Sequence, residues 1–247
     1  MKTRVLSSPA VAQRRIGGFP VRRLVRDISS VLIITGLLLV IDAGVTLVWQ
    51  EPVTAVIALI KRSQIDQQYL SYTTAPLASA QSHALTDLPT LQDRISFLAR
   101  SEQHEVATGD AIGRITIPKI GANYIIIQGT DTASLEKGPG HYPATAFPGL
   151  GQTVAIAGHR TTYLAPFRHI DALRPGDHIL VKMPYGMFTY AVQYTKIVLP
   201  TALWITRNVG YERLVLSACN PLYSAAQRIV IFARLKSVTP LGPARKI

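Results

Sequence analysis

Three residues at the ends of apolar segments could together perform acyl transfer: His159, Cys219 and Arg228. His159 follows the run Ala-Ile-Ala-Gly, Cys219 follows Leu-Val-Leu-Ser-Ala, and Arg228 begins the next apolar run. A thiolate can attack a carbonyl carbon, and an imidazole can exchange protons with the thiol and the leaving amine. A guanidinium can donate hydrogen bonds to the carbonyl oxygen as it gains negative charge. These side chains are sufficient for cysteine-dependent acyl transfer.

Cys219 is the only cysteine, and taken alone it is weak support for catalysis. A single cysteine in an apolar strand is more often an inert small hydrophobic residue. It also excludes an internal disulfide framework and a zinc site with several cysteines. The six histidines show no HxxxH or HExxH spacing, so we expect no metal and no cofactor. The acids of the C-terminal half are too dispersed to indicate a calcium site (Asp131, Glu136, Asp171, Asp177 and Glu212).

The elements that position the three residues are predicted to be β-strands. From Ala111 onward, short segments rich in β-branched residues alternate with turns that contain Gly and Pro. Their spacing indicates an antiparallel barrel or sandwich, and the lack of strand–helix alternation argues against a Rossmann-type sheet. Helices are expected only in short crossovers such as residues 164–173. The predicted strands cover residues 114–118, 124–129, 153–158, 178–184, 188–200, 213–219 and 228–235.

Two motifs near the predicted strand ends resemble those of a known family. Gly138–Pro143 reads Gly-Pro-Gly-His-Tyr-Pro, and Gly158–Tyr163 reads Gly-His-Arg-Thr-Thr-Tyr. Together with residues 216–235, they are similar to the sortases, the cysteine transpeptidases of Gram-positive cell surfaces, and most similar to class E sortases. The resemblance covers about residues 110–236. It implies a mainly β fold, an eight-stranded sortase-type β-barrel with short helices, preceded by a transmembrane helix and a stalk.

The same resemblance implies roles for individual residues. His159, Cys219 and Arg228 match the catalytic histidine, cysteine and arginine of the family. Ala218 stands where the family signature Thr-Leu-x-Thr-Cys has a threonine next to the nucleophile. We expect Ala218 to border the substrate, together with four residues of the two motifs (Tyr142, Thr161, Thr162 and Tyr163).

The remaining polar residues near the motifs are expected to have structural roles. His141, His169 and His178 are expected to be structural, since the contexts of His169 and His178 fit a helix and a strand start. Arg160 is expected to be a solvated or salt-bridged neighbour of His159. Asp171 or Asp177 could orient His159, but the sequence does not show this, and the resemblance implies that no buried carboxylate is needed for it.

The N-terminal segment predicts a membrane anchor. Residues 1–27 contain seven basic residues and one acid, and residues 28–49 contain one charged residue, Asp42. At about 1.5 Å per residue, such a helix crosses a bilayer core of about 30 Å. The basic flank places the N-terminus in the cytoplasm and the rest of the chain outside. A cleaved signal peptide and a buried core helix are the alternatives.

The whole chain is basic, with a formal net charge of +12, yet charged residues are only 16% and apolar residues 48%. This composition excludes a disordered tail or a collagen-like fibre. We expect a basic cytoplasmic arm (1–27), a transmembrane signal anchor (28–49), a stalk or linker (50–109), a catalytic domain (110–236) and a C-terminal tail (237–247). Within the linker, residues 61–87 are expected to be mobile and residues 88–100 to form an amphipathic helix. The anchor accounts for the basic arm, so no nucleic-acid partner is expected.

The resemblance implies a single-pass cell-membrane enzyme with its catalytic domain outside the cell. Such an enzyme cleaves a C-terminal sorting signal of exported proteins, of Leu-Ala-x-Thr-Gly or Leu-Pro-x-Thr-Gly type, and forms a thioacyl-enzyme. It then joins the exported protein to a cell-wall amine, such as that of a lipid II-like peptidoglycan precursor. A pilin-polymerising sortase and a catalytically silent β-barrel that binds wall polymers remain alternatives.

Overall fold

The computed structural model describes residues 21–49, 52–74 and 78–245, and it divides into two units, residues 1–45 and 46–247. Most of the predicted basic arm and the last two residues lie outside the described ranges. Among the described residues, α1 (Val21–Trp49) is the one helix long and apolar enough to cross a membrane. Its candidate span is Arg23–Val45, with a mean hydropathy of 2.3, and its described side chains are exposed. A core helix would instead bury such an apolar surface.

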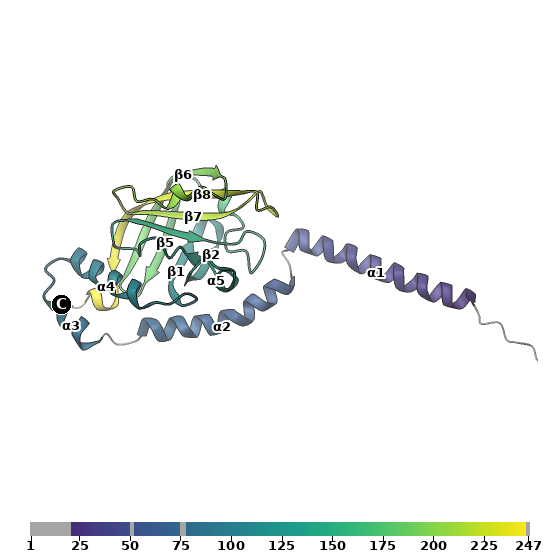
Figure 1. Cartoon of the computed structure of the whole chain (residues 1–247), viewed down its shortest axis with the longest axis horizontal. Helices are drawn as coiled ribbons and strands as arrows, with labels where there is room; N and C mark the ends of the chain where they lie inside the picture. Colours follow the sequence, from purple (N-terminus) through teal and green to yellow (C-terminus); the bar gives the residue numbers. More distant parts are fainter. Residues whose placement is uncertain (1–20, 50–51, 75–77, 246–247) are drawn as a thin grey trace, which may run out of the picture. The chain divides into compact units, whose positions relative to one another are not determined.

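The second unit is built around a closed β-barrel (Figure 1). The strand order around the barrel is β1-β2-β3-β4-β7-β8-β6-β5, and β5 pairs with β1 to close it. The strands are β1 (Ala111–Ile117), β2 (Ala122–Gln128), β3 (Gly140–His141), β4 (Thr153–Ala157), β5 (His178–Met183), β6 (Gly186–Val198), β7 (Arg213–Asn220) and β8 (Gln227–Pro240).

The barrel differs from the predicted antiparallel arrangement in two pairings. β2 pairs with β3, and β4 pairs with β7, in parallel. β4 and β7 can be parallel because β5 and β6 lie between them in the chain and form the long connection that parallel neighbours require. β3 was missed because two residues carry no periodic signal. β8 continues beyond the predicted domain end, since residues 237–240 pair with β6.

Alternation along β7 separates the core from the outer face of the barrel. Leu214, Leu216 and Ala218 belong to the main core, whereas Val215 belongs to a second cluster. Because successive side chains of a strand point to opposite faces, Ser217 and Cys219 share the outer face with Val215. The strand therefore points Leu214, Leu216 and Ala218 into the barrel and carries the Cys219 thiol on the outer face.

Helix α4 (Leu91–Glu105) confirms the predicted amphipathic helix, with a shifted start and end. Thr90 caps it, since its side chain accepts a hydrogen bond from the Asp93 backbone N–H at 3.1 Å. Ile95 and Leu98 are buried in the main core. The remaining short elements are α3 (Ser79–Thr86), α5 (Thr132–Lys137) and the 3-10 turns η1 (Pro118–Ile120), η2 (Ile170–Ala172), η3 (Leu203–Thr206) and η4 (Gly242–Arg245).

The prediction of a mobile stalk is wrong for α2 (Pro52–Thr74), which lies against the barrel. Ile65 and Tyr69 are buried with apolar residues of β1 and β2. Asp66 forms an ion pair with Arg114 of β1 at 3.1 Å. The Ser-, Gln- and Thr-rich composition concealed this helix, because Ile65 and Tyr69, four residues apart, are the only buried residues among residues 63–74.

Candidate active site

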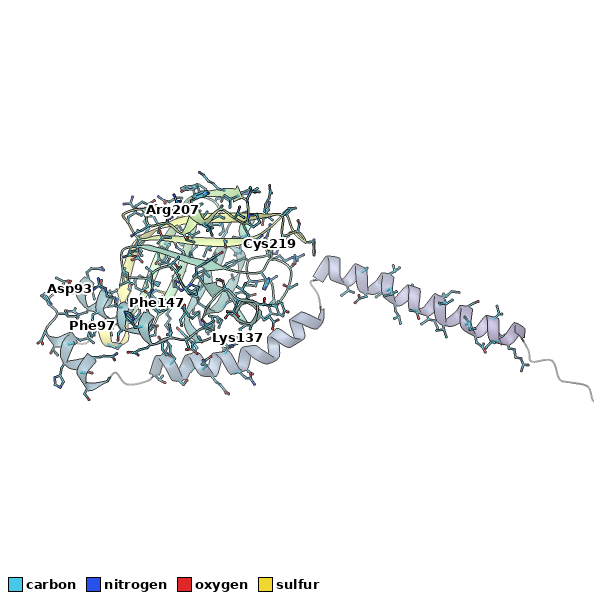
Figure 2. All side chains as sticks on the ribbon, viewed as in Figure 1. Asp93, Phe97, Lys137, Phe147, Arg207 and Cys219 are labelled. Carbon is cyan, nitrogen blue, oxygen red and sulfur yellow. The ribbon has the colours of Figure 1, made fainter. Side chains whose placement is uncertain are left out.

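Three neighbouring strands bring His159, Cys219 and Arg228 to one end of the barrel. β4 and β7 run parallel with Ala157 opposite Ser217, and Gly158 N–H donates to the Ser217 carbonyl at 3.0 Å. Two residues beyond that register lie His159 and Cys219. Arg228 is directly opposite Cys219 in the antiparallel β7–β8 pair. Figure 2 shows Cys219 at the end of the barrel opposite Asp93 and Phe97 of α4.

Cys219 is half-buried and is not in a disulfide. Its place on the outer face of β7 follows from the alternation of that strand. Residues directly opposite each other in an antiparallel pair have Cβ atoms about 4.5–5.5 Å apart and share a face. The Cβ atoms of Cys219 and Arg228 therefore lie close together, and both side chains are accessible to a ligand from outside the barrel.

His159 lies in the loop that follows β4, and its ring is half-buried. Burial lowers the pKa of His159 below its ordinary value, and the Glu136 carboxylate opposes this shift. The ring lies at 5.3 Å from the Tyr163 ring, centroid to centroid, and the Tyr163 hydroxyl donates to Glu136 Oε1 at 3.1 Å. A lowered pKa keeps the imidazole neutral near pH 7, so it can accept a proton.

Glu136, rather than Asp171 or Asp177, is the acid that acts on His159. Asp171 pairs with Arg160 at 3.0 Å, and Asp177 accepts a hydrogen bond from the Arg174 backbone. No sequence signal connects Glu136 with His159, because they come from separate elements that only the closed barrel brings together.

The Arg228 guanidinium is held at the strand end. Its Nη1 donates to the carbonyl oxygens of Ala225 and Gln227, both at 2.9 Å. These two bonds fix one nitrogen of the planar guanidinium group to the backbone of residues 225–227. Within the described part of the chain, Nε and Nη2 donate to no protein acceptor, so they remain able to bind an oxygen near the Cys219 thiol.

The loop after His159 has an unusual backbone. Tyr163, Leu164 and Ala165 have φ angles of 49°, 64° and 41°, a left-handed conformation that costs a non-glycine residue about 1–3 kcal/mol. The Tyr124 hydroxyl holds this turn by donating to the Leu164 carbonyl at 3.1 Å. Strain of this kind persists where surrounding contacts fix it, and it is common beside active sites. Two further predicted substrate contacts, Thr161 and Thr162, lie half-buried in the same loop.

Tyr142 and Ala218 lie on different faces of the barrel wall. The Tyr142 hydroxyl is 2.9 Å from Ser217 Oγ, on the face that carries Cys219. Ala218 is 3% exposed and its methyl group is in the main core. The predicted contact of Ala218 with a substrate would therefore have to involve its backbone.

Three histidines were expected to have structural roles: His141 lies in β3, His169 precedes η2 and His178 begins β5. His141 is buried, with Nδ1 at 2.8 Å from Gln128 Oε1 and Nε2 at 3.1 Å from the Ala146 carbonyl. Burial lowers the pKa of His141 to about 4, so it is neutral over the physiological range. His169 and His178 are exposed, before η2 and at the start of β5.

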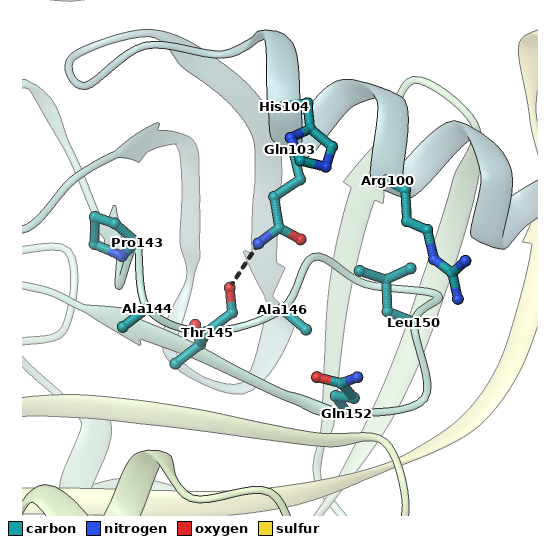
Figure 3. Close-up of a pocket in the computed structure, with 9 residues that line it drawn as sticks. All are labelled: Arg100, Gln103, His104, Pro143, Ala144, Thr145, Ala146, Leu150 and Gln152. Carbon is teal, nitrogen blue, oxygen red and sulfur yellow. Dashed lines mark hydrogen bonds between the residues drawn. The ribbon is translucent and has the colours of Figure 1, made fainter.

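A hollow of about 420 Å³ lies between α4 and the segment that leads into β4 (Figure 3). Gln103 borders it and ties α4 to the barrel by donating to the Thr145 carbonyl at 3.3 Å. None of the three candidate catalytic residues lines it. Within the described residues, no group of three or more His, Cys, Asp or Glu side chains is placed to hold a metal ion.

Comparison with known proteins agrees with this geometry. Residues 115–236 match the family described as the sortase domain. Sortase D of Bacillus subtilis is 37% identical over 131 residues, which are 51% of this chain and 65% of that protein. Sortase E1 of Streptomyces coelicolor is 26% identical over 148 residues, which are 53% of this chain and 42% of that protein. The matched region thus spans less than two thirds of either relative.

Solved structures show the same barrel. Sortase E from Streptomyces avermitilis has a TM-score of 0.50 and 32% identity, covering 55% of this chain and 93% of that one. Sortase E1 from Streptomyces coelicolor, solved with a tripeptide in its active site, has a TM-score of 0.52 and 26% identity, covering 53% and 91%. These likenesses confirm the predicted eight-stranded sortase-type barrel, and the chain belongs to the sortase family.

Proposed function

We propose that the protein is a membrane-anchored cysteine transpeptidase that cleaves a C-terminal sorting signal and joins the cleaved protein to an amine. The observation that carries this proposal is the position of Cys219, flanked by His159 after β4 and by Arg228 on β8, at one end of the barrel. Family membership supports the same chemistry. The half-exposed thiol is accessible to an extended peptide, as acyl transfer requires.

The reaction follows from the three side chains. His159 takes the proton of the Cys219 thiol, and the thiolate attacks the carbonyl carbon of the signal threonine. Arg228 donates hydrogen bonds to the oxygen that becomes negative. The C–N bond to the next residue breaks, and His159 gives its proton to the leaving amine. An acceptor amine then attacks the thioester and the C–S bond breaks. His159 takes one proton from the attacking nitrogen, which becomes the nitrogen of the new amide. The thiolate returns unchanged, so the cycle is balanced.

We propose that the substrates are exported proteins with a Leu-Ala-x-Thr-Gly or Leu-Pro-x-Thr-Gly signal, and that the acceptor is a peptidoglycan precursor amine of lipid II type. Relatives of class D and class E both match this chain, and class E membership stays a prediction. The tripeptide in the active site of the Streptomyces coelicolor enzyme supports a peptide substrate.

Cleavage of signal peptides tests this function. The full chain in detergent is incubated with Leu-Ala-x-Thr-Gly and Leu-Pro-x-Thr-Gly peptides and with scrambled controls. We expect cleavage between Thr and Gly, and a second product with the mass of the amide when an amine is added. Mass spectrometry measures both. If Cys219 is alkylatable and neither signal peptide is cleaved, the proposal is wrong.

The proposed orientation predicts that Cys219 is outside the cell. A membrane-impermeant maleimide should therefore label intact cells once per chain, because this is the only cysteine and it is half-exposed. A Cys219→Ala chain is the control for background labelling. Labelling that requires a permeant maleimide or cell lysis would show that the barrel is cytoplasmic.

A further inference from the structure

A second set of side chains lies next in sequence to the three candidate catalytic residues. Arg160 follows His159, Asn220 follows Cys219, and Gln227 precedes Arg228. Asn220 and Gln227 are directly opposite each other in the β7–β8 pair. Neighbouring residues of a strand point to opposite faces, so Asn220 and Gln227 lie on the other face of the sheet from Cys219 and Arg228.

Hydrogen bonds connect the three side chains into a chain. Arg160 Nη1 donates to Asn220 Oδ1 at 3.2 Å and to the Cys219 carbonyl at 3.4 Å. Asn220 Nδ2 in turn donates to Gln227 Oε1 at 3.3 Å. The network thus crosses from the loop after β4 to the end of β7 and on to the start of β8.

Arg160 is the most strongly held member of this network. It is 3% exposed, contrary to the expectation of a solvated side chain, although the predicted salt bridge is present. Its Nη2 pairs with Asp171 Oδ2 at 3.0 Å, and its Nε donates to the Arg168 carbonyl at 3.3 Å. A buried guanidinium is retained only where its donors are paired, and here acceptors from residues 168–171 and from the end of β7 pair them.

The network begins where the strand pairing stops. The last described backbone bond between the β4 and β7 segments joins Gly158 and Ser217, before either His159 or Cys219 is reached. Beyond that point no ladder fixes the separation of the imidazole and the thiol. Arg160 connects the two segments beyond that point, because it is one residue from His159 and donates to the backbone carbonyl of Cys219.

We propose that Arg160, Asn220 and Gln227 are positioning residues that set the relative placement of His159, Cys219 and Arg228, with Arg160 as the main member. The proposal rests on the proposed function. The three residues should differ in how much they contribute to this placement. The Arg160 hydrogen bonds are part-buried and charge-assisted, whereas the bond between Asn220 and Gln227 is exposed and neutral, and water can replace it.

The test compares the full chain with four variants in a steady-state peptide-cleavage assay. Arg160→Lys keeps the charge but cannot copy the planar fork, so the imidazole shifts relative to the thiol. We expect kcat to fall by about 10²-fold, the scale of a misplacement of about 1 Å, with KM changed by less than about threefold. Asn220→Ala should lower kcat by about tenfold, and Gln227→Ala by less than about threefold.

The pH dependence of Cys219 alkylation by iodoacetamide separates positioning from general destabilisation. A neighbouring imidazolium favours the thiolate at low pH. If Arg160 holds that arrangement, the alkylation profile of Arg160→Lys moves to higher pH even though the charge is retained. The matched control is Arg213→Lys, at the other end of β7. Arg213 is also buried, at 4% exposure, and it donates to the Ile205 and Arg207 carbonyls.

The control should lose thermal stability while keeping kcat and the alkylation profile of the unchanged chain. Equal kcat in Arg160→Lys and the unchanged chain would overturn the proposal, as would an equal loss in Arg213→Lys. If Arg160→Lys does not fold, Asn220→Ala decides by the same two measurements, since its half-exposed side chain is not needed for the core. An unchanged chain that cleaves no peptide contradicts the proposed function, and the alkylation profiles then decide on the network alone.

Discussion

Replacing Cys219 with alanine is expected to abolish peptide cleavage and amide formation. The chain has no other thiol, so no thioacyl-enzyme can form. Loss of the nucleophile in acyl-transfer enzymes lowers turnover by about 10⁴-fold or more. The fold should be unaffected, because the substitution removes one sulfur atom from a half-buried position at the end of β7. Peptide turnover and the thermal unfolding curve of the full chain measure the two effects.

Intact-mass spectrometry supplies the control for this variant. With a signal peptide and no acceptor amine, the unchanged chain should gain the mass of the acyl fragment on Cys219, and the alanine variant should gain none. Ser217→Ala is a matched variant on the same face of β7. It removes a hydroxyl near the thiol but leaves the nucleophile, so it should retain acylation. Product formation by Cys219→Ala would refute the proposed mechanism.

The strands that carry the chemistry could be predicted because each is a run of β-branched residues that ends at a polar residue. His159, Cys219 and Arg228 stand at such ends, so their place at a barrel rim followed from the pattern. The register in which these strands pair could not be predicted from the sequence. The parallel pairing of β4 with β7 places His159 beside Cys219, and it depends on how β5 and β6 close the barrel.

The residues that support the site were harder to predict, because their roles depend on tertiary contacts. Nothing in the sequence distinguishes Arg160 from an ordinary surface arginine. It is buried because it binds the backbone carbonyls of Arg168 and Cys219 and the side chains of Asp171 and Asn220. Glu136 acts on His159 from a different element for the same reason. Ala218 shows the opposite error, since its proximity to Cys219 in the sequence concealed that its side chain points into the core.

Replacing His159 and Arg228 should produce different losses. His159→Ala removes the group that moves a proton in both halves of the reaction, so it should approach the loss of Cys219→Ala. Arg228→Ala removes one preorganised donor, which costs about 10²–10³-fold in turnover. Arg228→Lys should recover little, because an ammonium group cannot copy the planar fork. Steady-state turnover of the three variants measures this order.

The pH dependence of turnover separates the two roles further. Reference pKa values are about 6.5 for imidazole and about 8.5 for a thiol, so a thiolate–imidazolium pair gives a bell-shaped profile that belongs to the coupled pair. Burial lowers the pKa of His159, so the acidic limb should lie at lower pH than for a free imidazole. Arg228→Ala should lower turnover across the whole pH range, because it removes a donor to the oxyanion that stays charged throughout this range. His159→Ala should abolish the bell shape, because the coupled pair no longer exists.

The turnover of these variants decides whether Arg228 holds the oxyanion or only supports the loop between β7 and β8. If Arg228 holds the oxyanion, its Nη1 bonds to Ala225 and Gln227 fix the orientation of the guanidinium, and Nε or Nη2 meets the substrate oxygen. Loss of the side chain then lowers turnover while alkylation of Cys219 continues, because alkylation needs the thiolate and no oxyanion donor. Near-normal turnover in Arg228→Ala, with His159→Ala inactive, would instead make Arg228 a strand-end residue that supports the loop. Another donor near Cys219 would then have to stabilise the oxyanion.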